Sequence, residues 1–175
     1  MKLEIISDKN KAKYIFMTGL LTEDNNKPNY TETEFNIAWD SWLNFYVLYN
    51  NEGNVVSFCG IRKFKGGYGR IFDRYFCMPE YRIPSFLNED EVYIFYFLPK
   101  LMIDCRNAGL IPFFSIQSDK KKKVSKLVAK KFNKLLPSKD KFKVLDGLYC
   151  TAPGSWQNIA MTYPYKTLLK RKKDG

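Results

Sequence analysis

The stretch that decides the fold is Tyr68-Gly-Arg-Ile-Phe-Asp-Arg-Tyr-Phe-Cys-Met-Pro-Glu-Tyr-Arg82. Aromatic and aliphatic residues fill much of the segment from Ile71 to Met78, as expected for a mostly buried strand. The strand should stop at Pro79, because proline cannot donate a ladder hydrogen bond, and the chain should then turn outward. The rest of the predicted architecture is built around this strand.

Turn signals before the central strand predict an antiparallel meander. Gly53 lies in a polar run between two apolar runs and can adopt a left-handed turn conformation. A second turn, Lys65-Gly-Gly67, leads into the central strand. We therefore expect three consecutive antiparallel strands, near residues 45–49, 55–64 and 69–78.

The N-terminal part of the chain is predicted to begin with a strand and a helix. The strand covers residues 3–6, where apolar and polar side chains alternate weakly. Asp8 is a suitable N-cap for a helix over residues 11–21, in which Ala12 and Phe16 belong to one apolar stripe.

A second, shorter helix is expected after a polar loop. Thr31-Glu-Thr-Glu34 resembles a capping box, in which the first and last side chains satisfy backbone N–H groups at the helix start. Trp39 and Trp42 are three residues apart and should share a face of this helix. They either pack in the core or form an aromatic wall of a substrate cleft.

A strand–helix–strand unit is predicted after the central strand. Residues 89–107 are apolar enough for a buried helix, with Asn88 as its N-cap and Gly109 just beyond its end. Pro99 should kink or divide this helix. Since residues 110–117 form the next strand, the connection should be a right-handed parallel crossover.

The remaining pattern adds one helix and two strands. A helical stripe covers residues 124–136, and strand candidates cover residues 142–149 and 155–163. The element order is therefore βααβββαβαββ. This order predicts a mixed α+β fold whose sheet is mostly antiparallel with one parallel crossover. We expect a single domain over residues 1–165 and a basic C-terminal tail over residues 166–175.

The composition favours a folded domain with a substantial core. The chain has 175 residues, of which 45% are hydrophobic and 17% aromatic. No apolar run reaches the ~18 residues of a membrane helix. The N-terminal segment has an early Glu4 and no small-residue cleavage site, so it does not resemble a signal peptide, and a cytoplasmic location is expected.

Histidine is absent, and the cysteines are widely spaced in the sequence. Zinc sites with histidine ligands are therefore excluded, as are Ser-His and Cys-His nucleophile pairs. We expect no metal, and we expect the cysteines to be buried and reduced. The cysteines are Cys59, Cys77, Cys105 and Cys150.

The net charge of +11 is concentrated in two lysine-rich runs. One begins with residues 120–123 and continues through Lys126, Lys130, Lys131 and Lys134, and the other covers residues 170–173. Positive potential of this kind attracts phosphates on nucleic acids or coenzymes, and also acidic proteins. The alternative interpretation is a solvated helix face and a loose tail.

The element order, with Met78-Pro-Glu-Tyr-Arg82 closing the central strand, resembles the GCN5-related N-acetyltransferase (GNAT) family. Members commonly have a strand that ends in Val-x-Pro-Glu/Asp-Tyr-Arg and is followed by a glycine-rich turn into a helix. The resemblance covers most of the chain by element order and residues 76–82 by motif. It implies a protein that transfers an acetyl group from acetyl-CoA to an amine.

The resemblance also implies which residues bind the coenzyme. In the family, the end of this strand separates from its neighbour, and the freed backbone groups hydrogen-bond the pantetheine arm of acetyl-CoA. That role falls here on Phe76, Cys77 and Met78. The following turn and helix N-terminus offer backbone N–H groups to the pyrophosphate. In this chain that turn contains Arg82, Ile83 and Ser85.

The turn departs from the family signature, Gln/Arg-x-x-Gly-x-Gly/Ala. Counting from Arg82, Ser85 and Leu87 stand at the two small positions, and Pro84 has no N–H to donate. The phosphate cradle is therefore bulkier and has fewer donors than in the family. The Asn and Tyr that usually follow the next strand are also missing.

Acyl transfer to an amine requires a proton acceptor. Without histidine, the acceptor must be a carboxylate, a tyrosine or a water chain. Asp73 is the first candidate because it is an acidic residue within a largely apolar strand; an ion pair with a cation such as Arg62 is the alternative. Tyr149 lies on a late strand that would border the acceptor site in such a fold, and ordinary core packing is its alternative.

Three functions are therefore open from the sequence. The chain is a divergent acyltransferase, a GNAT-like interaction module without coenzyme binding, or a basic nucleic-acid-binding protein. They differ in the ligand they bind: acyl-CoA, a protein partner, or an oligonucleotide.

Overall fold

The computed structural model describes residues 1–22, 31–82, 93–116, 129–152 and 155–162. The chain divides into two compact units. The first comprises Met1–Lys63 and Ile71–Ile103, and the second Phe64–Arg70 and Asp104–Gly175.

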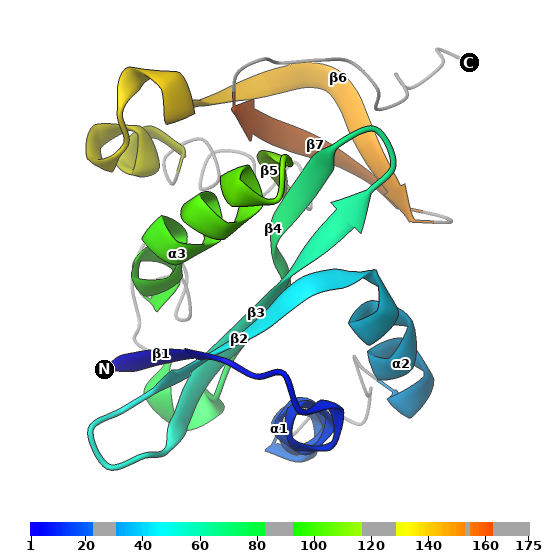
Figure 1. Ribbon diagram of the computed structural model, residues 1–175, viewed down its shortest axis with the longest axis vertical. Helices are drawn as coiled ribbons and strands as arrows, with labels where there is room; N and C mark the ends of the chain where they lie inside the picture. Colours follow the sequence, from blue (N-terminus) through cyan, green and yellow to red (C-terminus); the bar gives the residue numbers. More distant parts are fainter. Residues whose placement is uncertain (23–30, 83–92, 117–128, 153–154, 163–175) are drawn as a thin grey trace. The chain divides into compact units, whose positions relative to one another are not determined.

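The first unit opens with β1 (Lys2–Ile5) and α1 (Lys9–Thr22) (Figure 1). Asp8 caps α1, since its Oδ1 atom accepts hydrogen bonds from the N–H groups of Asn10 at 2.9 Å and Lys11 at 3.3 Å. These bonds satisfy backbone donors that have no partner within the helix. The predicted cap is confirmed.

Helix α2 (Glu32–Ser41) begins with the predicted capping box. The N–H of Glu34 donates to Oγ1 of Thr31 at 3.1 Å, and the N–H of Thr31 donates to Oε2 of Glu34 at 3.2 Å. The helix ends earlier than predicted. Trp42 is its C-cap and also the first residue of β2 (Trp42–Tyr49), so no turn separates the two elements.

Strands β1, β2 and β3 (Val55–Phe64) form an antiparallel ladder. Leu48 of β2 lies opposite Leu3 of β1 and Ser57 of β3. The β2–β3 turn contains Gly53 at φ 82°, which is the left-handed conformation expected there. The predicted hairpin is confirmed.

The core of the first unit is a cluster of buried residues, rich in aromatic rings, from α1, α2 and the strands. Phe16 of α1 is fully buried, and its ring centroid lies 5.3 Å from that of Phe35 on α2 and 5.7 Å from that of Phe58 on β3. Phe58 in turn stacks on Phe76 of β4 (Tyr68–Cys77), with centroids 5.5 Å apart. Buried aromatic pairs of this kind therefore hold the end of β4 against the helices.

Trp39 and Trp42 belong to this core. Trp42 is buried, and Trp39 is partly buried against the cluster, with its ring centroid 6.5 Å from that of Trp42. Trp42 also stacks on Phe45 at 5.0 Å with nearly parallel rings. Of the two interpretations of this tryptophan pair, core packing is therefore the one the structure supports.

The second unit contains the parallel strand pair that the sequence predicts. Tyr68 at the start of β4 lies opposite Ile111 of β5 (Ile111–Ile116), and Arg70 lies opposite Phe113. β5 pairs antiparallel with β7 (Ser155–Thr162), and β7 pairs antiparallel with β6 (Phe142–Ala152).

The strand order along the sheet is β1-β2-β3-β4-β5-β7-β6. Together with the helices, it gives a mixed α+β fold in which β4 and β5 form the parallel pair. The element order agrees with the predicted order. None of the helices in the described ranges is long and apolar enough to span a membrane.

Helix α3 (Ile94–Asn107) runs through Pro99 without a break. Of the two effects predicted for this proline, a kink or a division, the division is not found. The expected C-terminal glycine is confirmed, because Gly109 has φ 73° and the N–H of Leu110 bonds to the carbonyl of Cys105 at 2.9 Å. Asn88, the predicted N-cap, lies outside the described residues.

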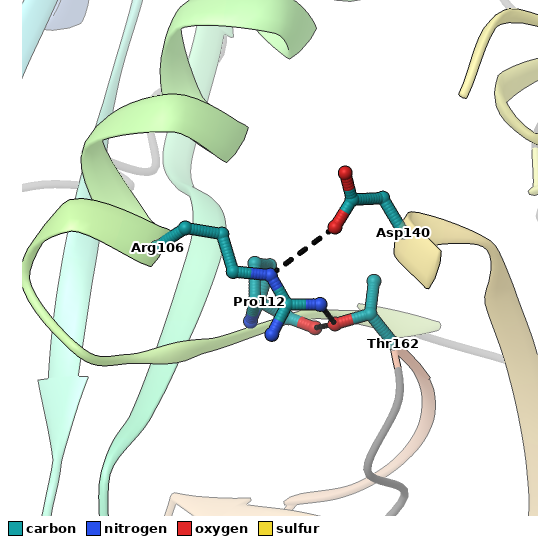
Figure 2. A network of polar contacts seen from close by, with 4 residues as sticks. All are labelled: Arg106, Pro112, Asp140 and Thr162. Atoms are coloured by element: carbon teal, nitrogen blue, oxygen red, sulfur yellow. Dashed lines mark hydrogen bonds and ion pairs between the residues drawn. The ribbon is translucent and has the colours of Figure 1, made fainter. Parts of the chain in front are cut away.

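A polar network joins the end of α3 to three other segments of the second unit (Figure 2). The guanidinium of Arg106 donates from Nε to Oδ1 of Asp140 at 3.3 Å and from Nη2 to Oγ1 of Thr162 at 3.0 Å. The hydroxyl of Thr162, which is fully buried, donates to the carbonyl of Pro112 at 3.1 Å. Arg106 thus links α3 to β7 and to the turn η3 (Ser138–Asp140), and Thr162 extends the network to β5.

A second cluster of aromatic residues belongs to the same unit. The ring of Phe142 is 5.0 Å from that of Phe114 and 6.0 Å from that of Phe132. Phe132 belongs to a helical segment over residues 129–135, which is the described part of the predicted helix 124–136. Asn133 of that segment bonds both backbone groups of Phe142, at 2.8 and 2.7 Å, and so fixes the start of β6.

Candidate active site

Strand β4 ends in a short 3₁₀ turn, η1 (Pro79–Tyr81). The N–H of Tyr81 donates to the carbonyl of Met78 at 2.9 Å, and the N–H of Arg82 donates to the carbonyl of Pro79 at 3.2 Å. Proline suits the first position because its φ is already set and its missing N–H is not needed there. Glu80 is exposed.

The side chain of Tyr81 ties this turn to the β2–β3 hairpin. Its hydroxyl accepts a hydrogen bond from Nδ2 of Asn50 at 3.1 Å. The Oδ1 atom of Asn50 accepts from the N–H groups of Glu52 and Asn54, at 3.0 and 2.9 Å. A single asparagine therefore orders the hairpin turn and positions the chain where it leaves β4.

The Cys77–Met78 peptide shows which edge of β4 its carbonyl occupies. The N–H of Met78 donates to the carbonyl of Val56 on β3 at 2.9 Å. In a trans peptide the C=O and N–H bonds point in opposite directions. The Cys77 carbonyl therefore points away from β3, toward the opposite edge of β4.

The predicted coenzyme residues on β4 contribute backbone groups rather than side chains to this edge. The side chains of Phe76, Cys77 and Met78 are buried, with exposed fractions of 6%, 0% and 6%. Phe76 and Met78 belong to the aromatic core of the first unit. Their packing makes the end of β4 a fixed support for the peptide groups between them.

Arg82 lies back over the end of the strand it follows. Its Nε atom donates to the carbonyl of Cys77 at 3.1 Å. Its guanidinium carbon lies 5.2 Å from the centre of the Phe76 ring, within the range of a cation–π contact. The arginine of the Pro-Glu-Tyr-Arg motif is thus in contact with two of the three residues assigned to the pantetheine arm.

Asp73, the candidate base, is a buried carboxylate in the middle of β4, with 3% of its surface exposed. Its Oδ2 atom accepts a hydrogen bond from Nε1 of Trp42 at 2.8 Å. Gly60 makes room for this indole, because a Cβ atom at that position would lie 2.4 Å from Nε1. Arg62, the partner considered from the sequence, lies opposite Trp42 in the β2–β3 register.

The backbone around Asp73 is unusual for a strand. Its neighbours Phe72 and Arg74 have φ angles of 57° and 53°, in the left-handed region that residues with a Cβ atom rarely adopt. Each such residue costs about 1–3 kcal/mol and persists only where its surroundings enforce it, and such strain concentrates at functional sites. The sequence gives no sign of it, because neither residue is a glycine.

Burial raises the pKa of the Cys59 thiol well above its usual value, and the charge of Asp73 raises it further. Cys59, Cys77 and Cys105 are buried free thiols, as expected from the sequence. Among the residues that the structure describes, no three His, Cys, Asp or Glu side chains gather to hold a metal ion.

The remaining predicted site residues fall elsewhere. Tyr149 lies on β6, opposite Asn158 of β7. Ile83 and Ser85 lie outside the described residues, as do the lysine runs 120–123 and 170–173. The structure thus joins four of the predicted coenzyme residues at one strand end: Phe76, Cys77, Met78 and Arg82.

The sequence matches no protein-family model and no curated protein. Solved structures match over nearly its whole length. A GNAT-family acetyltransferase from Staphylococcus aureus Mu50 is 13% identical, with a TM-score of 0.55, over 92% of this chain and 98% of that one. Ard1 from Thermoplasma volcanium is 12% identical, with a TM-score of 0.56, over 92% and 97%.

A third neighbour is a putative N-acetyltransferase from Lactobacillus plantarum, 16% identical, with a TM-score of 0.54, over 93% of this chain and 98% of that one. These likenesses agree with the element order and with the parallel pairing of β4 and β5. The chain has the fold of the GCN5-related N-acetyltransferases.

Proposed function

We propose that this protein is an acyl-CoA-dependent N-acyltransferase that transfers an acetyl group to an amine. The observation that carries the proposal is the direction of the Cys77 carbonyl, which points away from β3 at the end of the central strand. An outward carbonyl at this place is a suitable acceptor for an amide N–H of a pantetheine arm. The acetyltransferases that share the fold support the same class of reaction.

The residues at the strand end fit such a ligand. The buried side chains of Phe76 and Met78 keep the strand end rigid, so that its peptide groups are in position before a ligand arrives. Arg82 brings a guanidinium, which pairs well with phosphate oxygens. We assign the phosphates to the segment that starts at Arg82 and includes Ile83 and Ser85.

The coenzyme supplies a thioester whose carbonyl carbon an amine can attack. A C–N bond forms, the C–S bond breaks, the amine loses a proton and the leaving sulfur gains one. We assign the role of proton acceptor to Asp73, which lies on β4, the strand of the proposed coenzyme residues. Its carboxylate is buried and is held in place by a hydrogen bond from Trp42. Tyr149 is assigned to the amine side of the site.

Thermal unfolding in the presence of ligand tests the proposal. Acetyl-CoA should raise the melting temperature saturably, because a ligand that binds only the native state stabilises it. ATP at the same concentration is the control for general attraction of polyphosphates to the lysines. Transfer is then measured as thiol release from acetyl-CoA with a panel of amines. Absence of a shift at saturating acetyl-CoA contradicts the proposal.

A second candidate function, a GNAT-like interaction module that does not bind acyl-CoA, is favoured by one contact. The hydrogen bond from Arg82 to the Cys77 carbonyl fills the position that the pantetheine arm requires. If this contact is permanent, the coenzyme cannot bind. The thermal-shift experiment separates the two functions, since only the acyltransferase responds to acetyl-CoA.

A further inference from the structure

We propose that Arg82 is an exchangeable occupant of the coenzyme site that makes the protein select phosphorylated CoA thioesters over pantetheine thioesters. Its guanidinium rests on the Cys77 carbonyl without coenzyme and moves to the phosphates when the coenzyme binds. This inference rests on the proposed function and specifies which thioester donors the site accepts.

The resting position of Arg82 follows from the Cys77–Met78 peptide. The Met78 N–H is bonded to Val56, so the Cys77 carbonyl lies on the other edge of β4, where the Arg82 Nε atom reaches it at 3.1 Å. A charged donor forms a stronger hydrogen bond than a neutral amide does. A neutral pantetheine amide therefore competes for this carbonyl at a disadvantage.

The contact with Phe76 defines the same position independently. The guanidinium carbon lies 5.2 Å from the centre of a ring that is itself stacked on Phe58. Since the ring cannot move without disturbing the core, it offers the guanidinium a fixed platform. The arginine is thus held by two groups of β4, the carbonyl and the ring.

The exchange has a consequence for the choice of substrate. A ligand with pantetheine amides alone displaces the guanidinium from the Cys77 carbonyl and provides no anionic group to bind it. A ligand that also carries phosphates gives the displaced guanidinium a new anionic partner. Binding to the two halves of CoA is therefore coupled through one side chain.

Two substitutions separate the two roles of Arg82. Gln has its side-chain nitrogen at the same number of bonds from Cβ as the Nε atom of arginine, so R82Q keeps a donor for the Cys77 carbonyl and loses the charge. Lys keeps the charge and has no donor at that position, so R82K weakens the carbonyl contact and keeps a cation for phosphate. Lys63→Met removes an exposed charge on β3 and is the control.

The experiment is calorimetric titration of the full chain with pantetheine, adenosine 3′,5′-bisphosphate and CoA. We expect R82K to bind pantetheine about tenfold more tightly than wild type and the bisphosphate about equally, since ~1.4 kcal/mol is tenfold in affinity. We expect R82Q to bind the bisphosphate about tenfold more weakly and pantetheine slightly more tightly, since its neutral donor still competes for the Cys77 carbonyl but less strongly than the guanidinium does. K63M should match the wild type for both ligands.

Circular dichroism and the melting temperature verify that each variant is folded. If R82K and R82Q change the affinities for both fragments in parallel, or change neither affinity, the proposed exchange of Arg82 is wrong. The proposed function is still supported in that case if the wild type binds CoA. If the wild type binds none of the three ligands, the proposed function is wrong, and the role of Arg82 fails with it.

Discussion

Trp42 donates its indole N–H to Oδ2 of Asp73 at 2.8 Å, and both residues are buried. The bond satisfies a buried carboxylate oxygen and a buried indole at once, and either group left alone would be costly. The same contact has a structural and a catalytic interpretation. Substitutions that keep the hydrogen bond and remove the ionisable group distinguish them.

Asp73→Asn should reduce transfer strongly and leave the fold intact. The asparagine carbonyl can still accept from the Trp42 indole, whereas it cannot take up a proton from the amine. We expect kcat to fall at least ~100-fold, the usual contribution of a general base. The melting temperature and its shift with acetyl-CoA should stay close to wild type.

The control for this substitution is Trp42→Phe, which removes the donor and keeps the carboxylate. It should lower stability by about 1–3 kcal/mol, since Asp73 then loses a buried partner. An asparagine variant with wild-type kcat and normal coenzyme binding would show that Asp73 is structural only. Asp73→Asn is thus expected to change kcat, and Trp42→Phe is expected to change stability.

Gly60→Ala should destabilise the protein, because the added Cβ would lie 2.4 Å from Nε1 of Trp42. The indole must shift, which disturbs its stack on Phe45 and its bond to Asp73. Overpacking of this kind costs about 1–3 kcal/mol. Urea unfolding measures the loss, and an unchanged midpoint would mean that the indole moves without penalty.

Ser57→Ala on the same strand should have the opposite outcome. The Ser57 hydroxyl is fully buried and has no hydrogen-bond partner among the described residues. Removing it relieves an unsatisfied polar group and leaves almost the same volume. We expect the urea midpoint to stay equal or to rise. A clear drop would indicate a hydrogen-bonded water at this position.

Thr162→Val should weaken the network shown in Figure 2. The substitution removes a hydroxyl that accepts from Arg106 at 3.0 Å and donates to the carbonyl of Pro112 at 3.1 Å. Because that carbonyl then lacks its buried donor, we expect a loss of about 1–3 kcal/mol in urea unfolding. Thr162→Ser keeps the hydroxyl and should recover most of the loss.

Stability should fall in alkaline solution partly through Cys105. Burial raises the pKa of this thiol from 9.0 to about 12. The charge of Arg106 lowers this pKa and the charge of Asp104 raises it, both by less than burial does. Above pH 9 the unfolded chain loses the thiol proton while the folded chain keeps it, so the free energy of unfolding decreases up to about pH 12. The slope from one such group is about 1.4 kcal/mol per pH unit.

Cys105→Ala provides the comparison, since lysines and tyrosines titrate in the same range. The difference between wild type and variant in urea unfolding should decrease as the pH rises from about 8 to about 10.5. A difference independent of pH would mean that the folded thiol titrates like an unfolded one. Slow labelling of Cys105 by a thiol reagent at pH 8 is a second readout.

Local signals in the sequence predicted most of the fold. Asp8 and the Thr31–Glu34 box marked helix starts, since a cap acts within a few residues of the chain. Gly53 and Gly67 marked turns that require positive φ. The strand end at Pro79 followed from a missing N–H. Each of these signals depends on residues within a few positions of one another, so it can be recognised in the sequence alone.

The site was less predictable because its contacts join distant segments. The sequence pattern places Trp42 on a helix face, whereas in the structure it begins β2 and its indole bonds to the carboxylate of Asp73, 31 residues later. The left-handed conformations of Phe72 and Arg74 are not indicated by local propensity, because neither residue is a glycine. The contact of Arg82 with the Cys77 carbonyl depends on the orientation of the Cys77–Met78 peptide, which the sequence does not indicate.

The stack of Trp42 on Phe45, with its N–H on a carboxylate, makes this residue a built-in optical reporter. Indole fluorescence depends on the charge and hydration around the ring, and here the ring is buried against the candidate base. In a chain in which Trp39 and Trp156 are replaced by phenylalanine, Trp42 would be the one remaining indole. Its emission would then follow events at Asp73 in real time, during ligand binding as well as during unfolding.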